Sequence, residues 1–201
     1  MRSRQQISRA WLARPTLTVA RQLLGCYLVH DTSEGVYVGR IVETEAYCGP
    51  EDKGAHSSGG KRTKRNEVMF GEAGHAYVYL IYGMYWCVNV TTDLPSRPHA
   101  VLIRALQPVQ GIDLMRKNSP GIKKENDLCK GPGRLCRAMD ISGKQYGLAL
   151  FEKQSSLCLC KGKLLSTEDV QESPRIGIPY AEEYADLPWR FSIHDNPCVS
   201  R

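Results

Sequence analysis

The stretch His75–Val90, HAYVYLIYGMYWCVNV, constrains the fold of this chain more than any other segment. It contains two apolar runs rich in aromatic and β-branched residues, which favour β-strands. Tyr82-Gly83-Met84 separates the two runs and predicts a tight turn between two antiparallel strands. Alternation along the first strand places Tyr77 and Tyr79 on one face of the predicted sheet and Val78 on the other. The segment therefore predicts a β-hairpin within an antiparallel sheet.

The remaining patterns predict further strands with a few helices around them. We expect a helix over Val19–Leu24 and strands over Cys26–Asp31, Val36–Ala46 and Ala100–Leu106. We also expect a helix that begins over Gly111–Arg116 and a separate helix over Leu128–Met139. A chain of 201 residues can bury one sizeable core. We expect a single α+β domain over residues 1–201, built on a largely antiparallel sheet, with residues 1–15 as a flexible basic arm.

The charge balance favours a polyanionic partner. The chain has 27 Lys and Arg against 21 Asp and Glu, a formal net charge of +6. Such an excess fits nucleic acid or an acidic membrane surface and does not decide between them. The longest apolar stretch, near Tyr77–Val90, is interrupted by Gly83 and Asn89. No run of about 18 apolar residues occurs, so we expect no membrane-spanning segment. The basic start of the chain has no continuous apolar stretch, so we do not expect an export signal.

The eight cysteines do not have metal-ligand spacing. The chain contains no C-x-x-C pair, and the one close pair is Cys158-x-Cys160. We therefore expect reduced thiols, several of them buried as small apolar side chains, and no structural metal.

Two carboxylates stand close together in the sequence ETEAY. Glu43 and Glu45 are two positions apart on a predicted strand, so their side chains point to the same face. One of them could act as a general base where the strand meets the following loop. The alternative is a solvated strand edge.

The Gly-, Ser- and Lys-rich segment Gly49–Gly74 is long for a loop in a compact domain, and such loops are often functional. Within it, GGKRTKRN places four cations in five positions. This pattern fits contacts to successive phosphates. The alternative is an ordinary charged surface loop.

Tyr82 differs from the other tyrosines of the hairpin. It lies next to Gly83 at the predicted turn, where a large ring serves no purpose unless it inserts into a partner. An aromatic pocket, an inserting side chain and a phosphate-binding loop are what an enzyme needs to extract a base from a DNA duplex. The three features together therefore favour nucleic acid as the partner.

Long motifs in this chain resemble the alkyladenine DNA glycosylase family, the mammalian type of 3-methyladenine DNA glycosylase. The resemblance runs from about Leu23 to Val199. The motif sequences are more similar to those of bacterial members than to those of mammalian members. It is carried by ETEAY, Ala55-His56, R-T-x-R-N at Arg62–Asn66, MFG, HAYVYLIYGMYWCVNV, LIRALQP and GPGRLCRAM.

The resemblance implies a role for each matching residue. Glu45 matches the carboxylate that activates the attacking water, and Arg104 matches the arginine that positions this carboxylate and the water. The resemblance also implies a single mixed domain with a curved antiparallel sheet from which the hairpin protrudes, and Tyr82 on this hairpin matches the residue that intercalates where the base has left the duplex. Asn89 matches an asparagine that crowds the 2-amino group of guanine. The base pocket is implied for Tyr47, His56 and Tyr79.

Contacts to the DNA backbone are expected from two places. The basic loop supplies Lys61, Arg62 and Arg65, and the resemblance adds Thr63, Met84 and Tyr85.

The implied enzyme is a monofunctional DNA glycosylase that flips damaged purines out of duplex DNA and hydrolyses the N-glycosidic bond. Implied substrates are 3-methyladenine, 7-methylguanine, hypoxanthine and ethenoadenine. No cofactor and no lyase step are expected, and the protein should be a monomer. It should be cytoplasmic if the chain is bacterial and nuclear if it is eukaryotic. One alternative is a non-catalytic nucleic-acid-binding module, but such a module would not need Glu45 and Arg104. The other is an RNA-modifying transferase, which would need a glycine-rich cofactor motif after a strand, and we do not find one.

Overall fold

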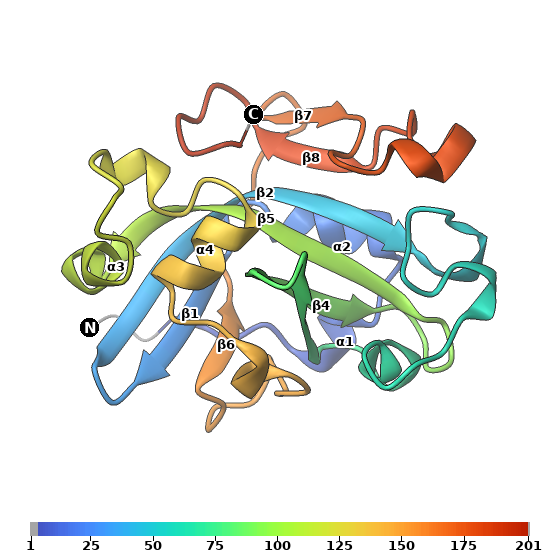
Figure 1. Cartoon of the computed structure of the whole chain (residues 1–201), viewed down its shortest axis with the longest axis horizontal. Helices are drawn as coiled ribbons and strands as arrows, with labels where there is room; N and C mark the ends of the chain where they lie inside the picture. The colour runs from blue at the N-terminus through green and yellow to red at the C-terminus, as the bar shows by residue number, and fades with distance from the viewer. Residues whose placement is uncertain (1–3, 201) are drawn as a thin grey trace.

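A sheet of eight strands forms the centre of the structure, a computed structural model that describes residues 4–200 (Figure 1). Six strands lie in the order β3-β4-β5-β2-β1-β6, and β8 pairs with both β2 and β7. All of these pairs are antiparallel. The strands are β1 (Tyr27–Thr32), β2 (Gly35–Cys48), β3 (Ala76–Ile81), β4 (Tyr85–Thr92), β5 (His99–Gln110), β6 (Leu157–Cys160), β7 (Val170–Ser173) and β8 (Arg190–Ile193). The predicted α+β fold on an antiparallel sheet is confirmed.

Short helices cover both faces of the sheet. In Figure 1, α2 lies behind β2 and β5, whereas α4 lies in front of them. The α-helices are α1 (Arg9–Leu12), α2 (Thr16–Leu23), α3 (Ile112–Asn118) and α4 (Pro132–Ala138). Single-turn 3₁₀ helices occupy Gly49–Glu51, Ser58–Gly60, Glu67–Phe70, Glu125–Asp127 and Gly143–Gln145, and a longer one occupies Pro179–Tyr184. Within residues 4–200, no helix has the length and apolar character needed to cross a bilayer.

Alternation along β5 separates the hydrophobic core from the functional face. Val101 and Ile103 are buried in the main hydrophobic cluster. Leu102 and Arg104, on the opposite face of the same strand, line a cavity. Because successive strand residues point to opposite faces, a single strand supports the core and presents polar groups to the cavity.

The hairpin has the turn that its sequence predicted. β3 pairs with β4 in a register that places Ile81 opposite Tyr85. Tyr82 and Gly83 both have positive φ, 52° and 68°, and the Met84 amide donates to the Ile81 carbonyl at 3.1 Å. This is a type I′ turn, which matches the twist of the strands. A tyrosine at its first central position is strained, because bulky side chains rarely adopt positive φ.

The first residues are packed rather than flexible. Ile7 and Leu12 are fully buried. The Ile7 amide donates to the Leu159 carbonyl at 2.9 Å, which joins the arm to the edge of β6. The prediction of a flexible arm over residues 1–15 is therefore wrong for this part of it, since its apolar side chains and backbone both find partners. Residues 1–3 lie outside the described residues.

Two helices begin elsewhere than predicted. α2 begins at Thr16, directly after Pro15, whose ring fixes a φ angle suited to a helix start. α4 begins at Pro132 rather than at Leu128, because Cys129 and Lys130 extend along β5: the Leu106 amide donates to the Cys129 carbonyl at 3.2 Å. Tertiary pairing therefore overrides the helical pattern at 128–131.

Candidate active site

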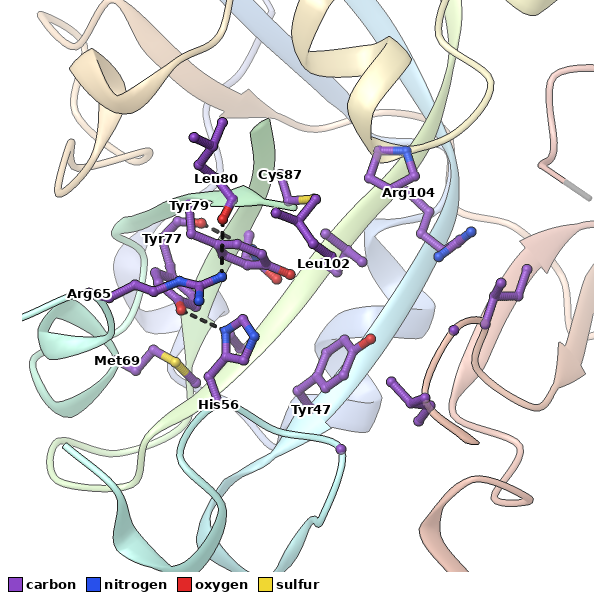
Figure 2. A pocket seen from close by; sticks show the side chains of 18 of the residues that line it. Tyr47, His56, Arg65, Met69, Tyr77, Tyr79, Leu80, Cys87, Leu102 and Arg104 are labelled. Carbon is purple, nitrogen blue, oxygen red and sulfur yellow. Dashed lines mark hydrogen bonds between the residues drawn. The ribbon is translucent and has the colours of Figure 1, made fainter. Parts of the chain in front are cut away.

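A cavity of about 390 Å³ lies on the face of the sheet opposite α2 (Figure 2). This volume is typical of sites for small organic ligands. It is lined by side chains from four strands and two loops, together with Tyr82 at the hairpin turn and Pro132 at the start of α4. Lining residues from the strands include Tyr47, Tyr77, Tyr79, Cys87, Asn89, Leu102 and Arg104; the loops contribute His56, Arg65, Ile176, Gly177, Ile178 and Tyr180.

Glu45 lies just beneath this cavity and is fully buried. Its Oε2 accepts a hydrogen bond from the Tyr47 hydroxyl at 2.8 Å, and its Oε1 accepts one from the Ile176 amide at 2.8 Å. Arg104 Nη1 lies 3.2 Å from Oε1. Burial raises the pKa of Glu45, against the opposing effect of the Arg104 charge and the two hydrogen bonds. Raising the pKa makes the carboxylate a stronger base.

Glu43 lies on the same face and has a different set of partners. Its Oε1 receives Arg190 Nε at 2.6 Å and Arg104 Nε at 3.2 Å, and its Oε2 receives the Ser200 amide at 2.8 Å. Both carboxylates are fully buried, so the alternative of a solvated strand edge is wrong. Glu43 holds the guanidinium of Arg104, whereas Glu45 lies under the Tyr47 hydroxyl at the cavity. The structure thus separates two residues that the sequence left equivalent.

Three aromatic side chains enclose the cavity at the positions that the sequence predicted (Figure 2). Tyr47 stands on one side, and His56 and Tyr79 lie together on the other, with ring centroids 4.6 Å apart. His56 Nδ1 is hydrogen-bonded to the Tyr77 hydroxyl at 2.7 Å. Tyr77 is 2% exposed, and its hydroxyl fixes the orientation of the His56 ring.

The His56 imidazole is uncharged near neutral pH. Burial lowers its pKa to about 4, and the nearby charges of Arg65 and Lys61 contribute to this shift. Its imidazole is therefore neutral and can stack or form hydrogen bonds, but it cannot act as an imidazolium acid near pH 7.

Asn89 combines the two interpretations that the sequence left open. Its Nδ2 donates to the Tyr77 carbonyl across the hairpin at 3.0 Å, so it satisfies backbone in the sheet. It also lines the cavity. Asn89 therefore supports the strand and also borders the cavity.

A buried ion pair behind Tyr47 has no signal in the sequence. Arg175 donates to both oxygens of Asp52, at 2.6 and 2.8 Å, and both side chains have no exposed surface. The Arg175 guanidinium also lies 4.7 Å from the centre of the Tyr47 ring. The next residue, Ile176, gives its amide to Glu45. This pair therefore holds two partners of Glu45 in place.

The basic loop does not present its cations as one cluster. Lys61, Arg62, Thr63 and Arg65 are all exposed. Arg62 donates to Glu67 at 2.9 Å, and the guanidinium of Arg65 lies over the Tyr79 ring at 4.7 Å. Asn66 fixes the loop: Oδ1 accepts the Thr63 amide at 2.7 Å, and Nδ2 donates to the Lys61 carbonyl at 2.8 Å.

Large side chains stand exposed at the tip of the hairpin beside the cavity. Tyr82 is 79% exposed, Met84 67% and Tyr85 50%. Tyr82 also lines the cavity rim. Gly133, at the start of α4, packs against Tyr85, and a Cβ at this position would come within 3.0 Å of the Tyr85 Cβ and 3.2 Å of its ring. The base of the hairpin is therefore supported while its tip is free.

The described residues show no arrangement for a metal. Within residues 4–200, no three side chains of His, Cys, Asp or Glu gather closely enough to hold an ion. All eight cysteines are free thiols in the described part of the chain.

Comparisons with a family model and with individual proteins all identify the same kind of DNA glycosylase. Residues 10–197 match the family model described as methylpurine-DNA glycosylase. A relative from Bacillus mycoides, named "Putative 3-methyladenine DNA glycosylase", is 50% identical over 193 residues, covering 92% of this chain and 95% of the relative. Relatives of the same name from Bacillus cereus and Bacillus cytotoxicus are 50% and 47% identical, with 92% of this chain covered in each case and 94% and 95% of the relatives.

Proposed function

We propose that this chain, which belongs to the methylpurine-DNA glycosylase family, excises 3-methyladenine and other damaged purines from duplex DNA after flipping them into the aromatic cavity. As a member of this family it is a DNA glycosylase, an enzyme that hydrolyses N-glycosidic bonds in DNA. The observation that carries the proposal is the buried carboxylate of Glu45 directly beneath a cavity walled by Tyr47, His56 and Tyr79.

In the proposed mechanism, Glu45 deprotonates a water that attacks C1′ of the flipped nucleotide. Its raised pKa makes the carboxylate a stronger base for this step. General-base catalysis contributes about 10²–10⁴-fold to the reaction rate. Arg104 holds the carboxylate in its ionised form and in position. The same carboxylate stabilises the positive charge that develops on the sugar as the bond to the base breaks.

The cavity walls select the base by stacking. Tyr47 and Tyr79 offer flat aromatic faces on which a purine ring can stack. We propose 7-methylguanine, hypoxanthine and ethenoadenine as substrates besides 3-methyladenine. Among the described residues that line the cavity there is no lysine, which supports a monofunctional enzyme without a Schiff-base step.

A strand-cleavage assay tests the function. The protein is incubated with a duplex carrying one hypoxanthine or one ethenoadenine, and abasic sites are then cleaved with hot alkali. We expect a single cleavage at the lesion only after alkali. Cleavage without alkali would contradict the monofunctional mechanism, and no cleavage of either duplex, nor of one carrying 3-methyladenine, would contradict the proposed function.

We expect Tyr82→Asn to impair base flipping without destabilising the protein. Asparagine followed by glycine is the preferred pair for a type I′ turn, so the free energy of unfolding should stay equal or rise. Excision should fall by about tenfold or more, because no ring fills the vacated stack and unpairing costs a few kcal/mol. Single-turnover rates on matched and mismatched duplexes measure the effect.

The defect of Tyr82→Asn should be larger for a well-paired lesion than for a mismatched one, which is already easier to extract. Equal defects in both duplexes, or a lower melting temperature, would instead assign Tyr82 to the fold.

We expect Asn89→Ser to relax the exclusion of guanine. A flat pocket cannot reject guanine by stacking, so rejection must come from a clash at its 2-amino group, and a shorter side chain removes that clash. Release of guanine opposite thymine should rise by about tenfold relative to release of hypoxanthine, in duplexes of matched sequence. Because Asn89 also binds the Tyr77 carbonyl, a parallel loss of both activities would mean that it only supports the strand.

We also propose that the partner is double-stranded DNA with a damaged purine, contacted by Lys61, Arg62, Thr63, Arg65, Met84 and Tyr85, and that the enzyme acts as a monomer. Its location, cytoplasmic in a bacterium or nuclear in a eukaryote, stays an expectation.

A further inference from the structure

Arg65 departs from the other cations of its loop, because its side chain turns toward the cavity (Figure 2). The guanidinium lies over the Tyr79 ring, 4.7 Å from its centre, and Nη2 donates to the Leu80 carbonyl at 3.3 Å. Figure 2 shows the guanidinium beside Tyr79, with its hydrogen bond to the Leu80 carbonyl drawn as a dashed line. A positive charge that is partly open to solvent therefore lies at the edge of the surface against which the base is expected to stack.

The loop holds Arg65 in this place. The adjacent residue, Asn66, is 1% exposed. It accepts the Thr63 amide and hydroxyl, and it donates to the carbonyls of Lys61 and His56. Asn66 thus ties the backbone next to Arg65 to the segment that carries His56. From this position the Arg65 side chain reaches the Tyr79 ring.

Damaged purines fall into two electrostatic classes. Alkylation at N3 or N7 gives a cationic ring, whereas deaminated and etheno-bridged purines are neutral. Aromatic faces attract a cationic ring. On the wall formed by Tyr79, however, Arg65 already occupies this attraction, and its own charge repels a second cation. Repulsion between two like charges near a protein surface is strong enough to change a binding equilibrium severalfold or more, even at a high effective dielectric constant.

We propose that Arg65 is a specificity-determining residue whose charge, held against Tyr79, shifts excision away from cationic purines and toward neutral ones. The inference rests on the proposed function of the same cavity. It concerns the charge of the base and is separate from contacts to the DNA backbone. A contact between Arg65 and a phosphate would affect every lesion equally, because each lesion has the same backbone.

The test compares two lesions in one sequence context. Single-turnover excision of 7-methylguanine, which is cationic, and of hypoxanthine, which is neutral, is measured with saturating enzyme for the wild type, Arg65→Met, Arg65→Lys and Lys64→Met. Lys64→Met removes an exposed cation from the same loop and serves as the matched control. The quantity of interest is the ratio of the two rates.

We expect Arg65→Met to raise the ratio of 7-methylguanine to hypoxanthine excision by about tenfold, and Arg65→Lys to stay nearer the wild-type ratio because it keeps the charge. Lys64→Met should leave the ratio unchanged. An unchanged or lower ratio in Arg65→Met would overturn the inference. A wild-type protein that excises neither of these lesions, nor 3-methyladenine, would instead contradict the proposed function.

A second measurement does not depend on excision. The groups that face His56 are the Tyr77 hydroxyl, the Tyr79 ring and the charges of Arg65 and Lys61. An NMR titration of the free protein should show that the His56 pKa, about 4, rises in Arg65→Met and stays low in Arg65→Lys. An unchanged His56 pKa in Arg65→Met would mean that the guanidinium does not stand at the cavity.

Discussion

Replacing Glu45 with glutamine is expected to abolish excision while binding to damaged duplex DNA persists. The variant removes the group that takes the proton from the attacking water, a loss of about 10²–10⁴-fold in rate. It keeps the shape of the side chain and therefore the cavity. Single-turnover excision measures the loss, and a binding titration with the same duplex measures what remains.

The geometry explains why glutamine fits this buried position. Its oxygen can take the place of Oε1 and accept from the Ile176 amide and from Arg104. Its nitrogen can take the place of Oε2 and donate to the Tyr47 oxygen, whose hydroxyl rotates to accept. The Ile176 amide keeps its acceptor, and the Tyr47 hydroxyl, which lines the cavity, turns its own hydrogen away from residue 45, so the fold should persist. An excision rate within a few-fold of the wild type would remove Glu45 from the mechanism.

The pH profile gives an independent check on Glu45. A general base works only when it is ionised, so the rate falls as the pH drops below its pKa. Burial raises this pKa above the ordinary value for glutamate, so the acid limb of the wild-type profile should lie at a correspondingly higher pH. This limb should be missing from the residual activity of Glu45→Gln.

The largest effect on stability is expected from Asp52→Asn. The change keeps the shape of the side chain and removes the anion that faces Arg175, whose side chain has no exposed surface. Leaving one charge of a buried pair without its partner costs about 3–5 kcal/mol of unfolding free energy. For a chain of this size the melting temperature should fall by roughly 6–20 °C.

Excision should fall together with stability in Asp52→Asn, because Arg175 supports the Tyr47 ring and precedes the amide that binds Glu45. The control is Glu67→Gln, which breaks the exposed pair with Arg62 and should leave the melting temperature nearly unchanged. Adding Arg175→Met to Asp52→Asn removes the unpaired cation, so the double variant should be more stable than the sum of the single changes predicts. Additive losses would mean that the two charges do not depend on one another.

Local patterns in the sequence determined the framework of this protein. Alternation along β3 and β4 predicted the hairpin, and Gly83 predicted its turn, because strand periodicity and turn conformation depend on neighbouring residues. The same alternation placed Glu43 and Glu45 on one face. The assignment of Glu45 rather than Glu43, however, came from family resemblance and not from spacing.

Tertiary structure decided which of these side chains can act and how. Glu43 is occupied by Arg190 and Ser200, from the last part of the chain, whereas Glu45 meets the Ile176 amide across 131 residues. The Asp52–Arg175 pair spans 123 residues. No periodicity encodes such partners, since they depend on how separate loops close over the sheet. For the same reason Arg65 cannot be distinguished in the sequence from the other three cations of its loop. Its position at the cavity is visible only in the folded structure.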